Sequence, residues 1–507
     1  VSLVGAIPVI GEDLLVWVRG DFLISGATLN RFFALHVVAL PIVLIALVVL
    51  HLLALHEVGS NNPDGIEIKK NKDANGIPVD GVPFHPYYTV HDLVGITVFF
   101  FVFCAIIFFA PEMGGYFLEP PNFQEANPLV TPEHVPPVWY FTPFYSMLRA
   151  VTVPLFGIDA KFWGMIVMFG AIAILFVLPW LDRSPVKSIR YKGWYSRIAL
   201  LIFISSFLIL GYLGTLGTSP ARIALAQFCT VLYFLFFFLM PWYTKKEQVF
   251  PEPQRVTGRW ISNKQLAITL ALLALLVVVP LKAVGAESSN VHLDEIELDL
   301  RDEASLQNGW KTYMNYCHSC HSLQYARYER TATDLNVPNN LVMDHLIFGD
   351  AAIGDLMENA MPADRSNNWF GKTPPDLTLI ARVRSPEWLY TYMRSFYEDE
   401  ARVYGVNNKV FANVGMPNVL HSLQGDVICT NNAESPDQCE LAHVEGTGEL
   451  TPEEFDTVIH DLVNFLYYIG EPVRLKRQAI GVYVLGFLAL LFILVVLLNR
   501  EYWRRIH

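Results

Sequence analysis

The sequence predicts a mainly α-helical protein, with a multi-span transmembrane bundle followed by an external helical domain that a C-terminal helix anchors in the membrane. Three observations predict this class. Of the 507 residues, 53% are hydrophobic, which is too many for a soluble chain of this length. Seven apolar runs are long enough to cross a bilayer, which takes about 20 residues. One long polar stretch, residues 287–474, separates the last two runs.

The seven runs and the charges between them predict a topology. The runs cover residues 32–55, 92–111, 161–181, 198–217, 222–242, 265–285 and 477–498. Lysine and arginine gather in the alternate connecting segments 57–90, 182–197 and 243–264 and in the C-terminal tail. Because basic loops stay on the cytoplasmic side, the loops 112–160 and 218–221 and the domain 287–474 are expected on the outer face.

The net charge of −12 is unevenly divided along the chain. Residues 287–474 carry 30 acidic and 12 basic side chains, a net charge of −18, and the remainder carries +6. An acidic domain does not suit nucleic acid, so we expect no nucleic-acid partner. A basic protein partner, steered by charge, fits this domain better.

A C-x-x-C-H motif stands at Cys317-His318-Ser319-Cys320-His321. This spacing is typical of covalent c-type haem, in which both thiols bond to the porphyrin and the histidine binds the iron. The alternatives are a zinc half-site and a redox dithiol, but a zinc site needs a second Cys/His pair at similar spacing, and none follows. We therefore expect covalent haem c on Cys317 and Cys320, with His321 as a metal ligand, in a cytochrome c-type domain.

The second axial ligand of this haem is expected to be a methionine, because thioether ligation raises the reduction potential. Two Met-Pro pairs compete for the role, Met361-Pro362 and Met416-Pro417, and the pattern alone does not decide between them.

Other residues of the polar domain have structural interpretations. Trp310, Tyr313 and Tyr316 precede the motif at helical spacing, which favours core packing over a role in electron transfer. Cys429 and Cys439 stand ten residues apart in a polar loop, and in an oxidising compartment they can form a disulfide. The sequence leaves open whether this disulfide forms.

Two histidines lie inside the first apolar run, where ionisable side chains are functional by default. His36 and His51 are 15 residues apart, which is about 22 Å along a helix and about 60° around it. Both therefore face one side, as ligands of two stacked haems would; the alternative is two histidines held by interhelical hydrogen bonds. Pro41 between them is expected to kink the helix.

No other run carries a matching histidine pair, so the second ligand of each of these irons is expected from a helix outside this chain. The start Val1-Ser2-Leu3 lacks an initiator methionine and a targeting signal, which also indicates a chain that begins within a longer protein.

Residues 262–286 have two interpretations. Lys264 before the apolar run and the small residues Val284 and Ala286 at its end are typical of a signal peptide, which inside a chain indicates two proteins joined end to end. The alternative is an ordinary spanning helix. Either delivers residues 287–474 to the outer face, and the sequence does not decide whether the chain is cut after Ala286. The predicted regions are 1–260, 261–286, 287–474 and 475–507.

Several motifs resemble the cytochrome bc1 complex. These are Asn30-Arg31-Phe32-Phe33-Ala34-Leu35-His36, His51-Leu52-Leu53-Ala54-Leu55-His56-Glu57, Gly59-Ser60-Asn61-Asn62-Pro63 and Phe84-His85-Pro86-Tyr87-Tyr88. Residues 1–260 resemble cytochrome b from just before its fourth helix onward, without the haem-binding helices that precede it. Residues 262–507 resemble cytochrome c1 with its leader, haem domain and C-terminal anchor. Together the two resemblances cover nearly the whole chain.

The resemblance implies roles for residues of the membrane region. His36 would bind a low-potential haem b near the outer face, and His51 a high-potential haem b near the cytoplasm. His56 and Asp92 match quinone-binding residues of the inner site, and His91 stands where the family often has lysine. Without the family, Asp92 would be interpreted as a helix N-cap or first-turn acid.

At the quinol-oxidation site the chain departs from the family. The family motif is Pro-Glu-Trp-Tyr, and here it is Pro137-Val138-Trp139-Tyr140, so the carboxylate that accepts a quinol proton is replaced. Glu133 or a chain of waters would have to substitute for it. Tyr140 and Tyr145 match the family's residues in this pocket.

In the polar domain the resemblance favours Met416 as the second haem ligand and leaves Met361 to core packing. Pro375, in Pro374-Pro375-Asp376-Leu377, matches the loop that flanks the haem. Arg384 matches an arginine near a haem propionate, a role that suits its charge-assisted hydrogen bonds; the alternative is a solvated surface charge.

The implied function is a share in ubiquinol:cytochrome c oxidoreductase, with haem c, two haems b and ubiquinone as cofactors. The implied partners are the Rieske iron–sulfur subunit, soluble cytochrome c and the rest of cytochrome b, in a dimeric complex of the bacterial inner membrane with a periplasmic haem c domain. One alternative is a truncated fusion in which only the haem c domain works, as a membrane-anchored electron carrier. Another is a haem-containing membrane sensor, although no signalling domain is visible.

Overall fold

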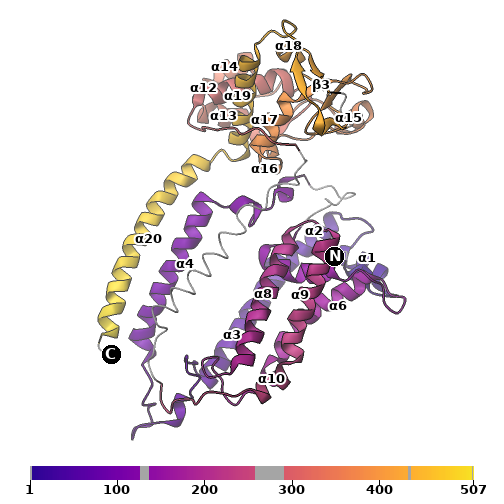
Figure 1. Cartoon of the computed structure of the whole chain (residues 1–507). Coiled ribbons are helices and arrows are strands. Elements are labelled where there is room, and N and C mark those ends of the chain that lie inside the picture. Colours follow the sequence, from indigo (N-terminus) through magenta and orange to yellow (C-terminus); the bar gives the residue numbers. More distant parts are fainter. Residues whose placement is uncertain (1–2, 126–135, 257–290, 432–434, 505, 507) are drawn as a thin grey trace. The chain divides into compact units, whose positions relative to one another are not determined.

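The computed structural model describes residues 3–125, 136–256, 291–431, 435–504 and 506. Helices dominate these residues (Figure 1), so the predicted mainly α-helical class is confirmed. The chain forms two compact units. The first contains residues 1–96, 126–284 and 494–507, and the second contains residues 97–125 and 285–493.

Six helical segments are long and apolar enough to cross a membrane. They are Gly26–Val58, Phe84–Phe109, Ala160–Leu181, Trp194–Thr215, Pro220–Phe238 and Arg474–Trp503. Each contains most of one predicted run, so six of the seven runs are confirmed as candidate spans. The seventh, residues 265–285, lies outside the described residues, as does the proposed cleavage point after Ala286.

Among the described residues of the first unit, the regular elements are helices. Its elements are η1 (Val4–Ala6), α1 (Gly11–Arg19), α2 (Gly26–Ala34), η2 (Leu35–Ala39), α3 (Leu40–Val58), η3 (Ile68–Lys70), η4 (Phe84–Tyr88), η7 (Trp139–Phe141), α5 (Thr142–Ala150), α6 (Ala160–Ala173), η8 (Ile174–Val177), α7 (Leu178–Leu181), α8 (Trp194–Thr215), α9 (Pro220–Phe238) and α10 (Met240–Lys246). Two long helices, α4 (Thr89–Phe109) and α20 (Arg474–Trp503), have residues in both units.

A close approach between backbones builds the core of the first unit. The short helix α5 packs against α6, α8 and α9. At Gly214 on α8, a Cβ atom would lie 2.2 Å from the carbonyl oxygen of Thr142, so only glycine fits there. Met147, Leu210 and Tyr233 are fully or almost fully buried in this contact. This packing fixes α5, which carries Tyr145.

The second unit has a helical core and three small sheets. Its remaining helices are η5 (Met113–Gly115), η6 (Pro120–Phe123), α12 (Glu303–Thr312), η10 (Tyr313–Cys317), α13 (Tyr328–Asp334), α14 (Asn339–His345), α15 (Ala363–Phe370), α16 (Ile380–Val383), α17 (Pro386–Arg394), α18 (His421–Gln424), η11 (Pro436–Gln438) and α19 (Pro452–Gly470). The sheets are antiparallel pairs: β1 (Leu323–Arg327) with β2 (Leu356–Met357), β3 (Phe396–Glu398) with β4 (Val406–Asn408), and β5 (Val427–Cys429) with β6 (Leu441–His443).

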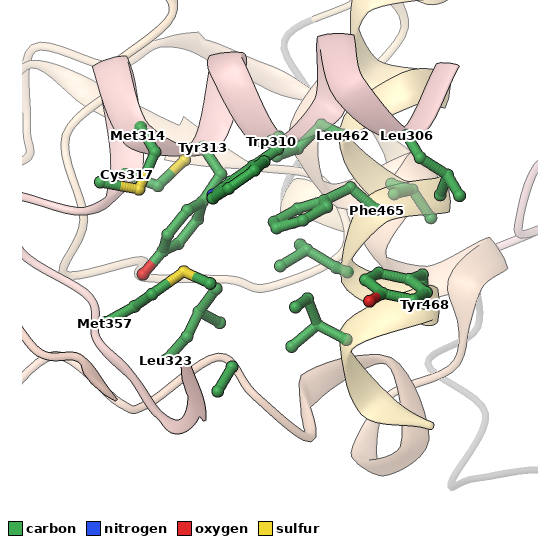
Figure 2. Close-up of a cluster of buried hydrophobic side chains, with 14 of the residues drawn as sticks. Leu306, Trp310, Tyr313, Met314, Cys317, Leu323, Met357, Leu462, Phe465 and Tyr468 are labelled. Carbon is green, nitrogen blue, oxygen red and sulfur yellow. The ribbon is translucent and has the colours of Figure 1, made fainter. Parts of the chain in front are cut away.

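Aromatic side chains fill the space between α12 and α19. Trp310, Tyr313 and Phe465 are fully buried, and the rings of Trp310 and Phe465 stack with centroids 6.4 Å apart. Figure 2 shows Cys317 and Met314 beside Tyr313 in the same cluster. The core-packing interpretation of Trp310 and Tyr313 is confirmed, and Tyr316 packs against the cluster while partly buried.

A disulfide joins Cys429 to Cys439. It ties the end of β5 to the residues just before β6, and with Tyr397 and Val427 these cysteines form a small separate cluster. The disulfide that the sequence left open is therefore present.

Replacing both cysteines, as Cys429→Ala/Cys439→Ala, is expected to lower the free energy of unfolding of the haem domain by about 2–3 kcal/mol, because the short closed loop is released in the unfolded chain. Thermal unfolding of the purified protein measures the change. A thiol reductant should bring the wild type to the transition of the variant and leave the variant unmoved. Equal transitions of the two proteins without reductant would contradict this expectation.

Candidate haem and quinone sites

The C-x-x-C-H motif lies in a tight turn at the end of the α12–η10 helix. Asp302 caps the start of α12 by accepting a hydrogen bond from the backbone N–H of Ser305 at 3.1 Å. After η10, the backbone N–H groups of Cys320 and His321 both donate to the carbonyl oxygen of Cys317, at 3.1 and 2.9 Å. The turn therefore brings the two thiols and His321 onto one short piece of backbone, as covalent haem attachment requires.

His321 is oriented by a hydrogen bond from its ring. Its Nδ1 atom lies 2.7 Å from the carbonyl oxygen of Pro375. Because a carbonyl only accepts, Nδ1 carries the proton and Nε2 is left as the free ligand atom. Burial lowers the pKa of His321, against smaller opposing effects of the Pro375 carbonyl and Asp376, which favours the neutral imidazole that binds iron.

The loop that carries Pro375 is fastened to the chain that follows the motif. The carboxylate of Asp376 accepts hydrogen bonds from the backbone N–H groups of Gln324 at 2.8 Å and Thr378 at 2.9 Å. The N–H of Leu377 donates to the carbonyl oxygen of Ser322 at 3.0 Å. These bonds hold the Pro375 carbonyl within hydrogen-bond distance of Nδ1 of His321.

Two buried tyrosines, Tyr313 and Tyr328, contact the histidines of the motif. The sequence reasoning placed Tyr313 in the core but missed these contacts. The hydroxyl of Tyr313 donates to the carbonyl oxygen of His321 at 2.5 Å and lies 3.3 Å from Nδ1 of His318. The hydroxyl of Tyr328 lies 3.4 Å from the other ring nitrogen of His318. Burial lowers the pKa of His318 and raises the pKa of the Cys317 thiol to about 12. The motif is therefore packed against buried side chains and is largely removed from solvent.

The structure treats the two candidate methionine ligands differently. Met416 packs against the main hydrophobic cluster of the domain, and its Sδ atom accepts a hydrogen bond from the hydroxyl of Tyr392 at 3.5 Å. Met361 is partly buried and is not among the residues of that cluster, so its interpretation as core packing is not supported. The choice of Met416 as iron ligand stays a prediction.

Two neighbouring arginines have different surroundings. Arg384 is exposed, with its guanidinium 5.1 Å from the ring centroid of Trp388. Arg382, which the sequence reasoning missed, donates from Nε and Nη2 to Glu112 at 2.9 and 2.6 Å and stacks on the ring of Phe123 at 4.1 Å. Arg384 is therefore left without a charged partner among the described residues, which suits a propionate, whereas Arg382 joins α16 to the segment after α4.

The two membrane histidines lie on one continuous helical segment. His36 is in the π-turn η2, and His51 is in α3. A π-turn takes up one extra residue, so the 15-residue spacing acts like 14, an offset of about 40°, and both side chains still face one side. Pro41 is the second residue of α3, two positions after the end of the π-turn.

Neither His36 nor His51 has a hydrogen-bond partner within the described part of the chain, and both are exposed. The alternative of interhelical hydrogen bonds is therefore not supported by these residues. Imidazoles that face outward from a spanning helix at two depths are a fitting donor set for two haems held against a second helix.

The residues matched to the inner quinone site lie near two helix ends. His56 is in the last turn of α3 and Asp92 in the first turn of α4, where its charge suits the helix dipole. Both side chains are exposed, and the described residues show no contact between them. His91 packs its ring against Trp503, 5.7 Å between centroids.

The residues matched to the outer quinol site lie on two consecutive short helices. Tyr140 is in η7 and is exposed, and Tyr145 is in α5, where the guanidinium of Arg149 lies 4.5 Å from its ring centroid. Arg149 donates to the carbonyl oxygens of Leu213 and Leu216 at the end of α8, at 2.7 and 2.9 Å. Glu133 lies outside the described residues, so a substitute for the missing carboxylate stays a prediction.

Fold and sites together define a helical domain with a C-x-x-C-H motif and an apolar C-terminal helix, which follows a region of several candidate membrane spans with two histidines in the first of them. Three family models match this chain. They are "Cytochrome b(N-terminal)/b6/petB" over residues 1–115, "Cytochrome b(C-terminal)/b6/petD" over residues 125–234 and "Cytochrome C1 family" over residues 349–506.

Relatives agree with this division. Cytochrome c1 of Allochromatium vinosum is 48% identical over 242 residues, 47% of this chain and 99% of that protein. Cytochrome b of the same organism is 59% identical over 262 residues, 51% of this chain and 62% of that protein. Cytochrome b/c1 of Bradyrhizobium diazoefficiens is 29% identical and aligns with 100% of this chain and 76% of its own length.

The chain belongs to the cytochrome c1 family, and its residues 1–115 and 125–234 are similar to the two parts of cytochrome b. It spans 62% of the length of the Allochromatium cytochrome b. These matches support a role in electron transfer of the bc1 type.

Proposed function

We propose that this chain takes part in transferring electrons from ubiquinol to a soluble cytochrome c, as a component of ubiquinol:cytochrome c oxidoreductase. The observation that carries the proposal is the Cys317–His321 turn with Nδ1 of His321 held by the Pro375 carbonyl. A redox dithiol needs no oriented histidine, and a zinc site needs further Cys or His ligands, which the described residues do not bring to this turn.

Haem held at this turn supplies one-electron redox chemistry. Cys317 and Cys320 would attach it, and Nε2 of His321 would bind the iron. Met416 is the proposed second ligand, and the Tyr392 hydroxyl donates to its Sδ atom, which withdraws electron density from the sulfur.

Two further haems are assigned to the membrane region. His36 and His51 would each supply one ligand, and the rest of cytochrome b the other. Such a ligand pair at two depths suits electron transfer across the bilayer.

Quinone sites are assigned to each side of the membrane. On the inner side, His56 and Asp92 bind the quinone and deliver protons to it. On the outer side, Tyr140 and Tyr145 position the quinol, whose protons leave toward the periplasm. The acidic haem c domain suits docking of a basic soluble cytochrome c. The remaining proposed parts are a Rieske iron–sulfur subunit, a dimeric assembly and location in a bacterial inner membrane.

Difference spectra of the expressed chain test the assignment. We expect one c-type haem per chain, and little b-type absorbance until the rest of cytochrome b is co-expressed. Reduced-minus-oxidised spectra measure both bands, and the mass of the purified product reports the covalent haem and any cut after Ala286. Absence of the c-type band after growth with intact haem-attachment machinery would refute the haem c site. Strong b-type absorbance from this chain alone would refute the need for a partner helix and would also contradict the alternative of a lone haem c carrier.

A further inference from the structure

The last turn of α20 contacts the segment that leads into α4. The indole Nε1–H of Trp503 donates to the carbonyl oxygen of Tyr87 at 3.2 Å. The same ring meets the rings of Tyr87, Tyr88 and His91 edge-on, with centroids 6.2, 5.4 and 5.7 Å away. Tyr502 adds a further contact to Tyr87 at 6.2 Å. All of these residues belong to the first compact unit.

The length of α20 explains why its end reaches this segment. Its 30 residues make a helix of about 45 Å, which is longer than the hydrocarbon core of about 30 Å. The last turn therefore extends into the interfacial region, where tryptophan and tyrosine are favoured. That preference explains an aromatic residue at this depth. It does not explain the specific contacts of Trp503, whose indole N–H binds a backbone carbonyl while its ring packs against three other rings.

The contacted face is the one that carries His91. Tyr87 and Tyr88 precede His91 by four and three residues, so the three side chains lie on one side of the helix. Asp92 is the next residue, about 100° around the axis. An anchor on the Tyr87 carbonyl and on the His91 ring thus restrains the turn from which both His91 and Asp92 project.

We propose that Trp503 is a positioning residue for the inner quinone site, so that the end of the cytochrome c1 anchor sets the geometry of a site in the cytochrome b region. This inference rests on the proposed function, which assigns Asp92 of this turn to that site. Trp503 itself does not contact the quinone. It holds the His91 imidazole and the first turn of α4 in place.

The test uses the assembled complex in membranes, with the outer site blocked by an inhibitor and haem b reduced by ubiquinol through the inner site. Trp503→Leu should slow this reduction or raise the ubiquinol concentration that it needs by about three- to tenfold, the effect of losing aromatic contacts of usual strength. Trp503→Phe keeps a ring against His91 and should retain most of the rate.

Tyr483→Leu is the matched control, since Tyr483 lies on the same helix, is 80% exposed and has no ring contact within the described part of the chain. It should behave as the wild type, with equal haem c content in all samples. Asp92→Asn separates the assignment of the inner quinone site from the positioning role of Trp503. If Asp92→Asn has no effect, the inner-site assignment itself fails. If Asp92→Asn impairs reduction but Trp503→Leu matches Tyr483→Leu, the positioning role is refuted.

Discussion

His321→Ala is expected to lower electron transfer from ubiquinol to soluble cytochrome c by more than about 100-fold. Removing a group that only supports a metal ligand already costs 10- to 100-fold, and this change removes the ligand itself. The neighbouring side chains do not replace it, because the ring nitrogens of His318 lie against the hydroxyls of Tyr313 and Tyr328. Ubiquinol:cytochrome c reductase activity of membranes measures the loss, and the shape of the c-type band reports the altered iron.

His345→Ala is the matched control for this change. His345 lies in the last turn of α14, is exposed and makes no hydrogen bond within the described residues. Its replacement should leave both activity and the c-type band unchanged. Wild-type activity in His321→Ala, in membranes with a normal amount of the chain, would exclude His321 as an iron ligand.

The membrane spans and the haem motif could be predicted because both are local features of the sequence. A helix that crosses a bilayer must be predominantly apolar, so composition alone located the six described spans to within eight residues at each end. Likewise, Cys317, Cys320 and His321 lie in one turn, and their spacing specifies the turn. Whether Cys429 and Cys439 form a disulfide could not be decided from the sequence, because the distance between two cysteines in the fold is not a local feature.

The support of the haem site could not be predicted because it depends on contacts between distant residues. The carbonyl group that orients His321 belongs to Pro375, 54 residues away. Every residue has a backbone carbonyl, so the sequence does not show which one accepts this hydrogen bond. The pairing of Arg382 with Glu112 spans 270 residues. Nothing local distinguishes Arg382 from Arg384, and the resemblance drew attention to Arg384 alone.

The π-turn at Leu35–Ala39 shows a different limit. Pro41 indicated a disturbance of the helix, but an α-helical wheel placed His51 about 60° from His36, whereas one π-turn changes the sense of that offset. The conclusion that both histidines share a face survives, because the change of about 100° carries the offset from about 60° on one side to about 40° on the other. A closer prediction of ligand direction needs the hydrogen-bond pattern itself.

Gly309→Ala is expected to destabilise the haem domain by roughly 2 kcal/mol. A Cβ atom at Gly309 would lie 2.0 Å from the carbonyl oxygen of Asp461 and 2.6 Å from Cβ of Phe465. Neither atom can move away by a side-chain rotation, so α12 and α19 must separate, at a cost of about 3 kcal/mol. The better helix propensity of alanine returns about 1 kcal/mol.

The displacement should also reach the haem, because α12 continues through η10 directly into Cys317. We therefore expect the thermal unfolding midpoint of the holoprotein to fall by about 4–8 °C, together with a changed c-type band. Gly354→Ala is the control, since a Cβ atom there meets no atom within 4 Å and its backbone is not left-handed. If Gly309→Ala unfolds at the same temperature as Gly354→Ala, the close packing of α12 on α19 is not what holds the haem-binding turn in place, and the support must come from the Pro375 loop alone.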